Sequence, residues 1–241
     1  MAQGRKFAVF DIDGTLIRWQ LFHAVTDALA QRGHIKPRSY QVMRDARQAW
    51  KRRSGGGFKD YETQVVGIYE AVLKTLTVEQ FESAADAVFE EYKDQIYTYT
   101  RDLIAKLKKQ GYLLFAISGS QTEVVAKIAD YYKFDDYVGT VYGRAGQGFS
   151  GSKKIGSFNK DKTLKRLVAK HNVSFEDSIG IGDSRGDIAM LELVDQPIAF
   201  NPERALFKHA QNKGWKVIVE RKNMVYELEE HDGKYQLAKT S

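Results

Sequence analysis

The sequence contains no cysteine and only five histidines. The lack of cysteine excludes disulfides, thiolate nucleophiles and cysteine-ligated zinc, and it fits a reducing compartment. The histidines are scattered and form no His-x-x-x-His pair, so a histidine metal site is not expected. Any metal ion would therefore be held by carboxylate oxygens, and Mg²⁺ is the cofactor that this ligand chemistry predicts.

Long apolar runs are also missing. No stretch approaches the ~18 apolar residues that a membrane span needs. The apolar run near the N-terminus covers residues 7–10 and stops at Asp11, which is too short for the core of a signal peptide. We therefore expect a cytoplasmic protein without a membrane partner.

The positive charge of the chain is unevenly distributed. The 241 residues carry a net charge of +6, and residues 32–53 hold a basic run opposed only by Asp45. A solvated helix face explains such a run, and an anionic partner, nucleic acid included, is the alternative. The composition is 43% hydrophobic and 28% charged, as in an ordinary globular protein. The length fits one α/β core with one inserted module.

Short apolar segments alternate with helical patterns along most of the chain. Strands are expected at residues 6–10, 112–117, 178–181, 197–200 and 216–219. Helices are expected at residues 101–109, 122–132, 161–171, 188–194 and 202–212, the last with Pro202 in its first turn. Near-continuous apolar strands that alternate with helices predict a doubly wound parallel sheet of the Rossmann-like α/β class.

The segment from residue 17 to residue 97 breaks this alternation, because its pattern is helical throughout. Thr77 and Gln80 form a plausible capping box within it, and a glycine-rich joint follows Ser54. We interpret residues 17–97 as a helical cap inserted into a catalytic core of residues 1–16 and 98–241. Residues 138–150, with glycines at their turns, predict a β-hairpin extension.

Three of the expected strands end in polar groups. Ligands bind outside the carboxyl ends of the strands in open parallel sheets. Asp11 and Asp13 follow the first strand and are two residues apart, so one carboxylate can attack phosphorus while the other protonates the leaving oxygen. Gly14 allows a tight turn beside an oxyanion. Taken alone, Asp-x-Asp-Gly is also an ordinary turn sequence.

The other two strand ends supply phosphate and metal ligands. Ser118, Gly119 and Ser120 precede a helix whose N-terminus can cradle phosphate, although Ser120 or Thr122 can also be a simple helix cap. Asp183 and Asp187 add carboxylates that, with Asp11, suit Mg²⁺. Capping of a helix is the alternative role of Asp187, and both roles can hold together.

Four ordered segments resemble the motifs of the haloacid dehalogenase superfamily. They are Asp11-Ile12-Asp13-Gly14-Thr15, Ile117-Ser118-Gly119-Ser120, Lys160-x-x-x-Leu164 and Gly182-Asp183-Ser184-x-x-Asp187. A helical insert between the first two motifs is similar to the cap of the phosphoserine-phosphatase-like branch. The resemblance covers almost the whole chain.

The resemblance implies a phosphatase that forms an aspartyl-phosphate on Asp11, with Asp13 as general acid and base. It also implies that Asp11, the Asp13 carbonyl and Asp183 bind Mg²⁺ and that Asp187 orders the surroundings of the metal. Ser118 and Lys160 would hold the phosphoryl oxygens, with Lys162 as a rival for Lys160.

Phosphate and substrate contacts are further expected from Gly119, Thr15 and Gln20. Phosphoserine phosphatases carry a glutamate where this chain has Gln20, and Val65 aligns loosely with their cap arginine. The substrate is therefore expected to be a small phosphorylated metabolite other than phosphoserine, with Arg18, Trp19 and Gln20 beside its leaving group. The basic cap helices would admit a more anionic ester, such as a nucleotide. There are two alternatives. One is a phosphotransferase of the same fold, and the other is a module that keeps the fold but binds nucleic acid or protein.

Overall fold

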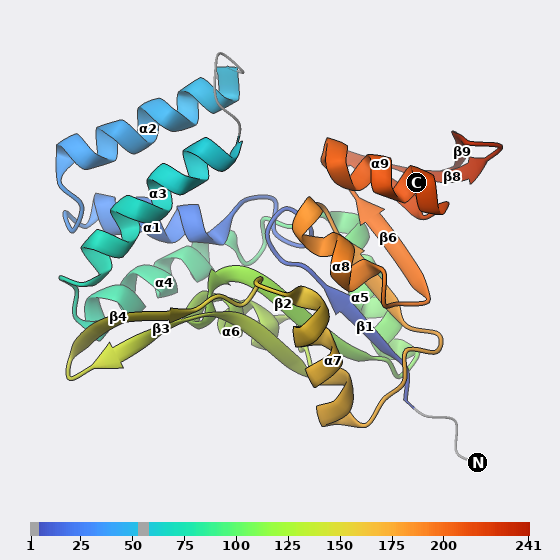
Figure 1. Ribbon diagram of the computed structural model, residues 1–241, viewed down its shortest axis with the longest axis horizontal. Helices are drawn as coiled ribbons and strands as arrows, with labels where there is room; N and C mark the ends of the chain where they lie inside the picture. The colour runs from blue at the N-terminus through green and yellow to red at the C-terminus, as the bar shows by residue number, and fades with distance from the viewer. Residues whose placement is uncertain (1–4, 53–57) are drawn as a thin grey trace.

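The computed structural model describes residues 5–52 and 58–241, so the joint predicted at residues 54–57 lies outside the described residues. Its centre is a nine-stranded sheet with the order β4-β3-β2-β1-β5-β6-β7-β8-β9 (Figure 1). The strands from β3 through β7 in this order are parallel, which confirms the predicted α/β class. The strands are β1 (Phe7–Phe10), β2 (Leu113–Gln121), β3 (Asp136–Ala145), β4 (Gly148–Lys154), β5 (Ile179–Gly182), β6 (Gln196–Phe200), β7 (Lys216–Arg221), β8 (Met224–His231) and β9 (Lys234–Thr240).

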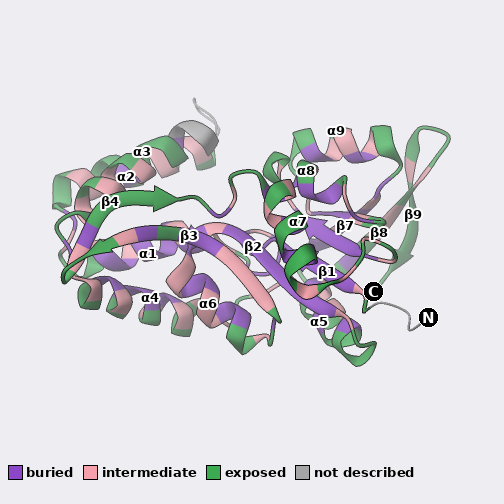
Figure 2. Cartoon of the chain, turned by 60° about the horizontal axis from the view of Figure 1, so that its bottom comes forward, coloured by how far each residue is buried: buried purple, intermediate pink, exposed green. Residues whose placement is uncertain are grey.

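Helices cover both faces of the parallel strands (Figure 2). In β1 the side chains of Ala8 and Phe10 join one apolar cluster, while Phe7 and Val9 join the other. Because both faces are buried, the strand reads as a continuous apolar run rather than an alternating one. The helices of the core are α5 (Thr98–Lys109) and α6 (Thr122–Tyr131) on the first cluster, and α7 (Lys160–His171), α8 (Ile188–Leu191) and α9 (Arg204–Lys213) on the second.

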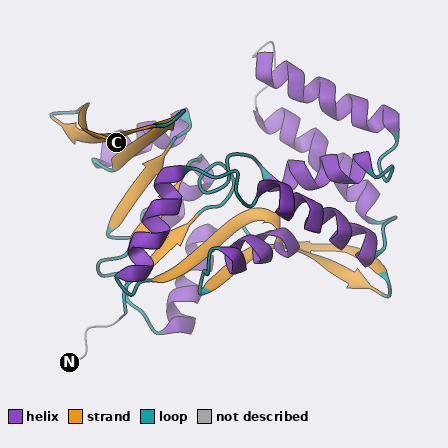
Figure 3. Ribbon diagram, turned by 180° about the vertical axis from the view of Figure 1, so that it is seen from behind, coloured by secondary structure: helices purple, strands orange, loops and turns teal. Residues whose placement is uncertain are grey.

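Four helices between β1 and α5 gather on one side of the molecule, beside the β3–β4 hairpin (Figures 1 and 3). These are α1 (Leu21–Gln31), α2 (Pro37–Arg52), α3 (Phe58–Leu73) and α4 (Val78–Tyr92). The predicted capping box is confirmed at the start of α4, where the Gln80 N–H donates to Thr77 Oγ1 at 3.1 Å and the Thr77 N–H donates to Gln80 Oε1 at 2.9 Å. The apolar faces of the four helices continue the cluster under α5 and α6.

The chain passes twice between these helices and the core, and the two connecting segments are hydrogen-bonded to each other. The Arg18 N–H donates to the Gln95 carbonyl at 2.9 Å, and the Tyr97 N–H donates to the Leu16 carbonyl at 3.0 Å. These paired connecting segments support the predicted cap of residues 17–97, whose boundaries stay a prediction. The basic run lies mainly on α2, where Arg38 and Arg44 are exposed and Arg47 is paired with Asp27 at 2.7 Å.

Several elements differ from the sequence prediction. The predicted hairpin is present, but β3 also pairs in parallel with β2, so it belongs to both the core sheet and the extension. The helix expected from Pro202 begins at Arg204, and the helix expected through Val194 is a 3₁₀ turn, Arg185–Asp187, followed by a single turn that ends at Leu191.

The C-terminal hairpin β8–β9 was missed, because its residues are mostly half-exposed or exposed and carry no buried apolar run. Within the described ranges, no helix is long and apolar enough to cross a bilayer. The cytoplasmic location stays a prediction.

Candidate active site

The carboxyl ends of three neighbouring strands carry the polar groups that the sequence singled out. Strands β2, β1 and β5 are adjacent in the sheet. Asp11 and Asp183 directly follow β1 and β5, whereas Ser118 lies inside β2, which extends past the expected end to Gln121. The Asp11 N–H still donates to the Ile181 carbonyl of β5 at 2.9 Å, so the nucleophile candidate is held at the very edge of the sheet. The expected convergence at one edge is therefore present.

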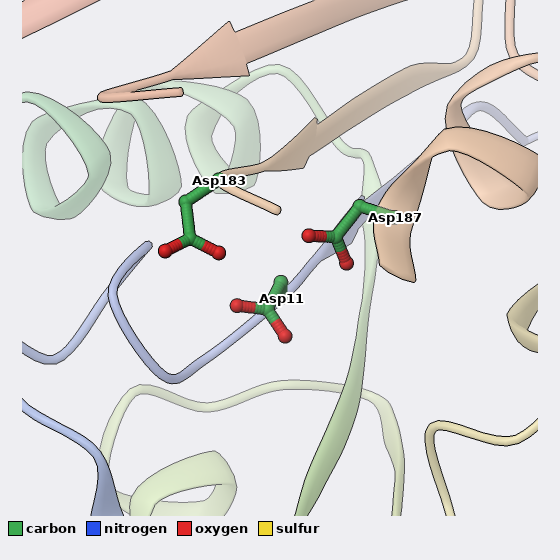
Figure 4. A group of neighbouring side chains, drawn as sticks. All are labelled: Asp11, Asp183 and Asp187. Atoms are coloured by element: carbon green, nitrogen blue, oxygen red, sulfur yellow. The ribbon is translucent and has the colours of Figure 1, made fainter. Parts of the chain in front are cut away.

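Three of the carboxylates form one cluster. Asp11, Asp183 and Asp187 each offer an oxygen, and these oxygens lie within 4.8 Å of one another (Figure 4). Gly14 makes the approach of Asp183 possible, because a Cβ at this position would lie only 2.2 Å from Asp183 Oδ2 and the φ angle of Gly14 is +84°. Gly182 does the same for Asp187, since a Cβ there would lie 2.5 Å from Asp187 Cβ. The cluster therefore depends on both glycines.

Lys160 provides a buried cation next to these carboxylates. Its Nζ donates to Asp11 Oδ1 at 2.7 Å and to Asp187 Oδ1 at 2.6 Å, and its side chain is only 4% exposed. Burial alone would lower the pKa of Lys160, but the negative charges of Asp11 and Asp187 raise it above its usual value. Lys162, the rival from the sequence, is exposed to solvent.

The side chain of Asp187 takes part in helix capping, while its role at a metal site stays a prediction. Its Oδ1 accepts from Lys160, and its Oδ2 accepts from the Ser184 backbone N–H at 2.9 Å and from Ser184 Oγ at 2.8 Å. The second set is a capping box on the short 3₁₀ turn after β5. Because these contacts occupy both oxygens, Asp187 is better placed to orient the cluster than to bind an ion directly.

Asp13 is bound by the polar end of β2 and by the cap. Its Oδ2 accepts from Ser118 Oγ at 2.5 Å, and its Oδ1 accepts from Ser120 Oγ at 3.0 Å and from the Leu21 N–H at 2.6 Å. Ser120 Oγ in turn accepts from the Phe22 N–H at 2.9 Å. The general-acid candidate is thus linked directly to the first turn of cap helix α1.

The helix-cap interpretation of Ser120 and Thr122 is wrong, because α6 is preceded by Gln121 at its N-cap and no side chain there bonds to the helix. The contribution of Ser120 to Asp13 was also missed. The spacing contained a signal for it, since residues two apart on a strand point to the same side, as Ser118 and Ser120 do here. No feature of the sequence indicated the hydrogen bond from the Leu21 N–H to Asp13.

The remaining expected contact residues differ in their burial and in their partners. Thr15 is fully buried, and its hydroxyl has no hydrogen-bond partner among the described residues. Gln20 is half-buried at the start of α1, where a Cβ on Gly14 would lie 3.5 Å from its Nε2. The Gly119 carbonyl accepts from Thr140 Oγ1 at 2.7 Å. Val65, by contrast, is buried in the apolar cluster of the cap.

Arg18 and Trp19, the residues before Gln20, each take part in a cation–π contact. The Arg18 guanidinium lies 5.5 Å from the centre of the Tyr97 ring, and Lys51 Nζ lies 5.2 Å from that of Trp19. Trp19 is half-buried and Arg18 is exposed. Positive charge therefore lies close to the segment that follows the Asp-x-Asp motif.

The site holds more negative charge than Lys160 can balance. Burial, together with the charges of Asp187 and Asp13, raises the pKa of Asp11 to about 7 against the opposing effect of Lys160. Burial also raises the pKa of Asp183 well above its usual range, with the charges of Asp11 and Asp187 adding to the effect, and it raises that of Asp13. A bound divalent cation would favour the ionised carboxylates instead. The donor set therefore fits a hard cation with oxygen ligands.

Known proteins resemble this chain in sequence and in fold. The chain is 28% identical over 219 residues to the "Inhibition of morphological differentiation protein" of Streptomyces azureus, covering 89% of this chain and 78% of that protein. It is 22% identical over 229 residues to a histidinol-phosphatase of Neisseria meningitidis serogroup C, covering 89% of this chain and 98% of that protein.

Among solved structures, a phospho-aspartyl intermediate analogue of phosphoserine phosphatase superposes with a TM-score of 0.63 at 18% identity, covering 91% of this chain and 95% of that chain. The sequence model of the haloacid dehalogenase-like hydrolases matches residues 8–192. The chain belongs to the haloacid dehalogenase-like hydrolase family.

Proposed function

We propose that this chain is a Mg²⁺-dependent phosphatase that hydrolyses a small phosphorylated metabolite through an aspartyl-phosphate on Asp11. The observation that carries the proposal is the position of Asp11, which lies in a buried cluster with Asp183, Asp187 and Lys160 and only two residues from Asp13. A phosphoserine phosphatase trapped as a phospho-aspartyl analogue is among the structures with the same fold. Histidinol-phosphatase is among the relatives in sequence.

In this mechanism Asp11 attacks phosphorus with a carboxylate oxygen and the ester oxygen leaves. Asp13 donates its proton to that oxygen and then takes a proton from the water that hydrolyses the aspartyl-phosphate. Burial raises the pKa of Asp13 above its usual value, which helps it to carry the proton at the start of the cycle. Ser118, Ser120 and the Leu21 N–H fix the position of the Asp13 carboxylate.

Lys160 lies against Asp11 and can neutralise charge on the transferred phosphoryl group, because its cation is buried and cannot be screened by water. Ser118, Gly119 and Thr15 are the proposed phosphate contacts, and the Thr15 hydroxyl, unpaired among the described residues, supports its inclusion. Asp11, the Asp13 carbonyl and Asp183 would hold Mg²⁺, with Asp187 orienting the set. The ion would supply charge neutralisation and electrophilic assistance at the phosphoryl oxygens.

The test is phosphate release from a panel of esters that includes phosphoserine, histidinol phosphate and nucleotides, with Mg²⁺ or EDTA. Wild type should release phosphate only with Mg²⁺, and Asp11→Asn should release none under either condition. Asp102→Asn, which changes an exposed aspartate of α5, is the matched control and should keep wild-type activity. Turnover by Asp11→Asn at the wild-type rate would contradict the proposed nucleophile. Added acceptor alcohols in the same assay would reveal phosphoryl transfer as a second product.

A further inference from the structure

A second group of buried polar atoms lies between the cap and the β3–β4 hairpin, outside the carboxylate cluster. Tyr69 of α3 and Gln121 at the N-cap of α6 are both fully buried. The hydroxyl of Tyr69 and both amide atoms of Gln121 have no hydrogen-bond partner among the described residues. Gln121 is close enough to lower the pKa of Tyr69, which burial raises, but the two groups do not meet hydrogen-bond geometry. Native proteins rarely leave such groups unpaired without a reason.

The position of this pair relative to Asp13 suggests the reason. Ser120 Oγ contacts Asp13 and the Phe22 N–H, and the Phe22 ring lies 4.8 Å from the ring of Tyr69. Ser120 and Phe22 therefore connect the general-acid candidate to Tyr69. Asp13 must face the leaving group if it protonates it, so a leaving group that extends from Asp13 toward the cap would approach the residues joined to Asp13 through Ser120 and Phe22.

The surroundings of the pair favour a particular ligand chemistry. Glu123 Oε2 is a further buried acceptor without a partner among the described residues, while Arg144 donates to Glu123 Oε1 at 3.3 Å. The Tyr142 ring lies 5.5 Å from that of Tyr69 and closes one side. The negative charges of Glu123 and Glu70 both act on Tyr69. A hydrogen-bond donor is favoured here, and a carboxylate or a second phosphate would be repelled.

We propose that Tyr69 and Gln121 form a specificity subsite that binds a hydroxyl or amino group on the leaving group of the substrate. The inference rests on the proposed function and narrows its substrate class to phosphate esters of hydroxy- or amino-alcohols. Because the pair is fully buried and Tyr69 packs on Tyr142 of the hairpin, the leaving group enters the pair only when α3 moves away from the hairpin. An ester that cannot satisfy the buried polar atoms leaves them unpaired, so the site discriminates against it.

The experiment compares ω-aminoalkyl and ω-hydroxyalkyl phosphates with alkyl phosphates of the same length, and uses p-nitrophenyl phosphate as a substrate without a donor. Wild type should prefer the donor-bearing esters. Tyr69→Phe, which removes one oxygen, and Gln121→Leu should raise KM for those esters about five- to tenfold, as expected for one lost hydrogen bond. Both variants should leave p-nitrophenyl phosphate turnover unchanged. Tyr99→Phe, at a half-buried tyrosine of α5 stacked on Phe200, should change neither ratio.

The outcomes separate the subsite from the proposed function. Unchanged preferences in Tyr69→Phe and Gln121→Leu, or an equal loss on every ester together with a lower melting temperature, would show a structural cluster and overturn the subsite alone. No Asp11-dependent turnover of any ester by wild type would overturn the proposed function and the subsite with it.

Discussion

Replacement of Gly14 by alanine tests whether the approach of Asp183 to the Asp-x-Asp turn is needed for activity. Gly14 has a φ angle of +84°, and a Cβ there would lie 2.2 Å from Asp183 Oδ2. Ordinary contacts begin near 3.4 Å, so the Asp183 carboxylate must move by about 1 Å. A displacement of this size at a reacting centre costs about 100-fold in rate. The left-handed conformation should also cost about 1–2 kcal/mol of folding free energy.

Gly111→Ala is the matched control, because Gly111 has a φ angle of +80° and a Cβ at this position would meet no described atom within 4 Å. Both variants should therefore lower the melting temperature by a similar amount, roughly 2–8 °C for a chain of this size. Only Gly14→Ala should lose about 100-fold in kcat with any ester that wild type hydrolyses, measured at saturating Mg²⁺. Equal activity in the two variants would refute the argument that Asp183 is held by the absence of a side chain at Gly14.

Lys160→Met should lower the free energy of unfolding by about 3–5 kcal/mol and abolish turnover, because it leaves Asp11 and Asp187 buried without their cation. Lys162→Met, two residues along the same helix and exposed, should do neither in denaturant titration or kinetics. Burial, assisted by Arg47, lowers the pKa of His23 from 6.5 to about 3. The unfolded chain therefore binds the proton first, and stability should fall by up to about 1.4 kcal/mol per pH unit as the pH drops through this window. His23→Gln should flatten that slope in pH-dependent unfolding, and the exposed control His231→Gln should not. EDTA should lower the melting temperature and remove activity, Mg²⁺ should restore both, and a midpoint insensitive to Mg²⁺ would contradict binding at the carboxylates.

The features that sequence predicted well are those with a local cause. A buried strand that ends at Asp11 follows from the apolar run of residues 7–10, and the capping box follows from the spacing of Thr77 and Gln80. The polar strand ends could be placed at one edge because parallel strands share an orientation. Lys160 could be selected over Lys162 only through the family resemblance, since both are lysines on the same helix.

Other features depend on contacts between distant segments. Asp13 is bound by the Leu21 N–H, and the bridge from Lys160 to Asp11 spans most of the chain. No periodicity predicts either contact, because the cap and core must first pack together. The C-terminal hairpin has exposed strands without a clean alternation, so tertiary pairing with β7 determines its structure instead.

The central claim is that Asp11 carries the phosphoryl group, and trapping that intermediate tests it most directly. Asp13→Asn should still be phosphorylated by radiolabelled p-nitrophenyl phosphate, because nitrophenolate leaves without a proton, but it lacks the base that activates water. Acid-quenched Asp13→Asn protein should therefore retain label that hydroxylamine removes, and the double variant Asp11→Asn/Asp13→Asn should retain none. Label that persists in the double variant, or turnover without any trapped label in Asp13→Asn, would contradict the account.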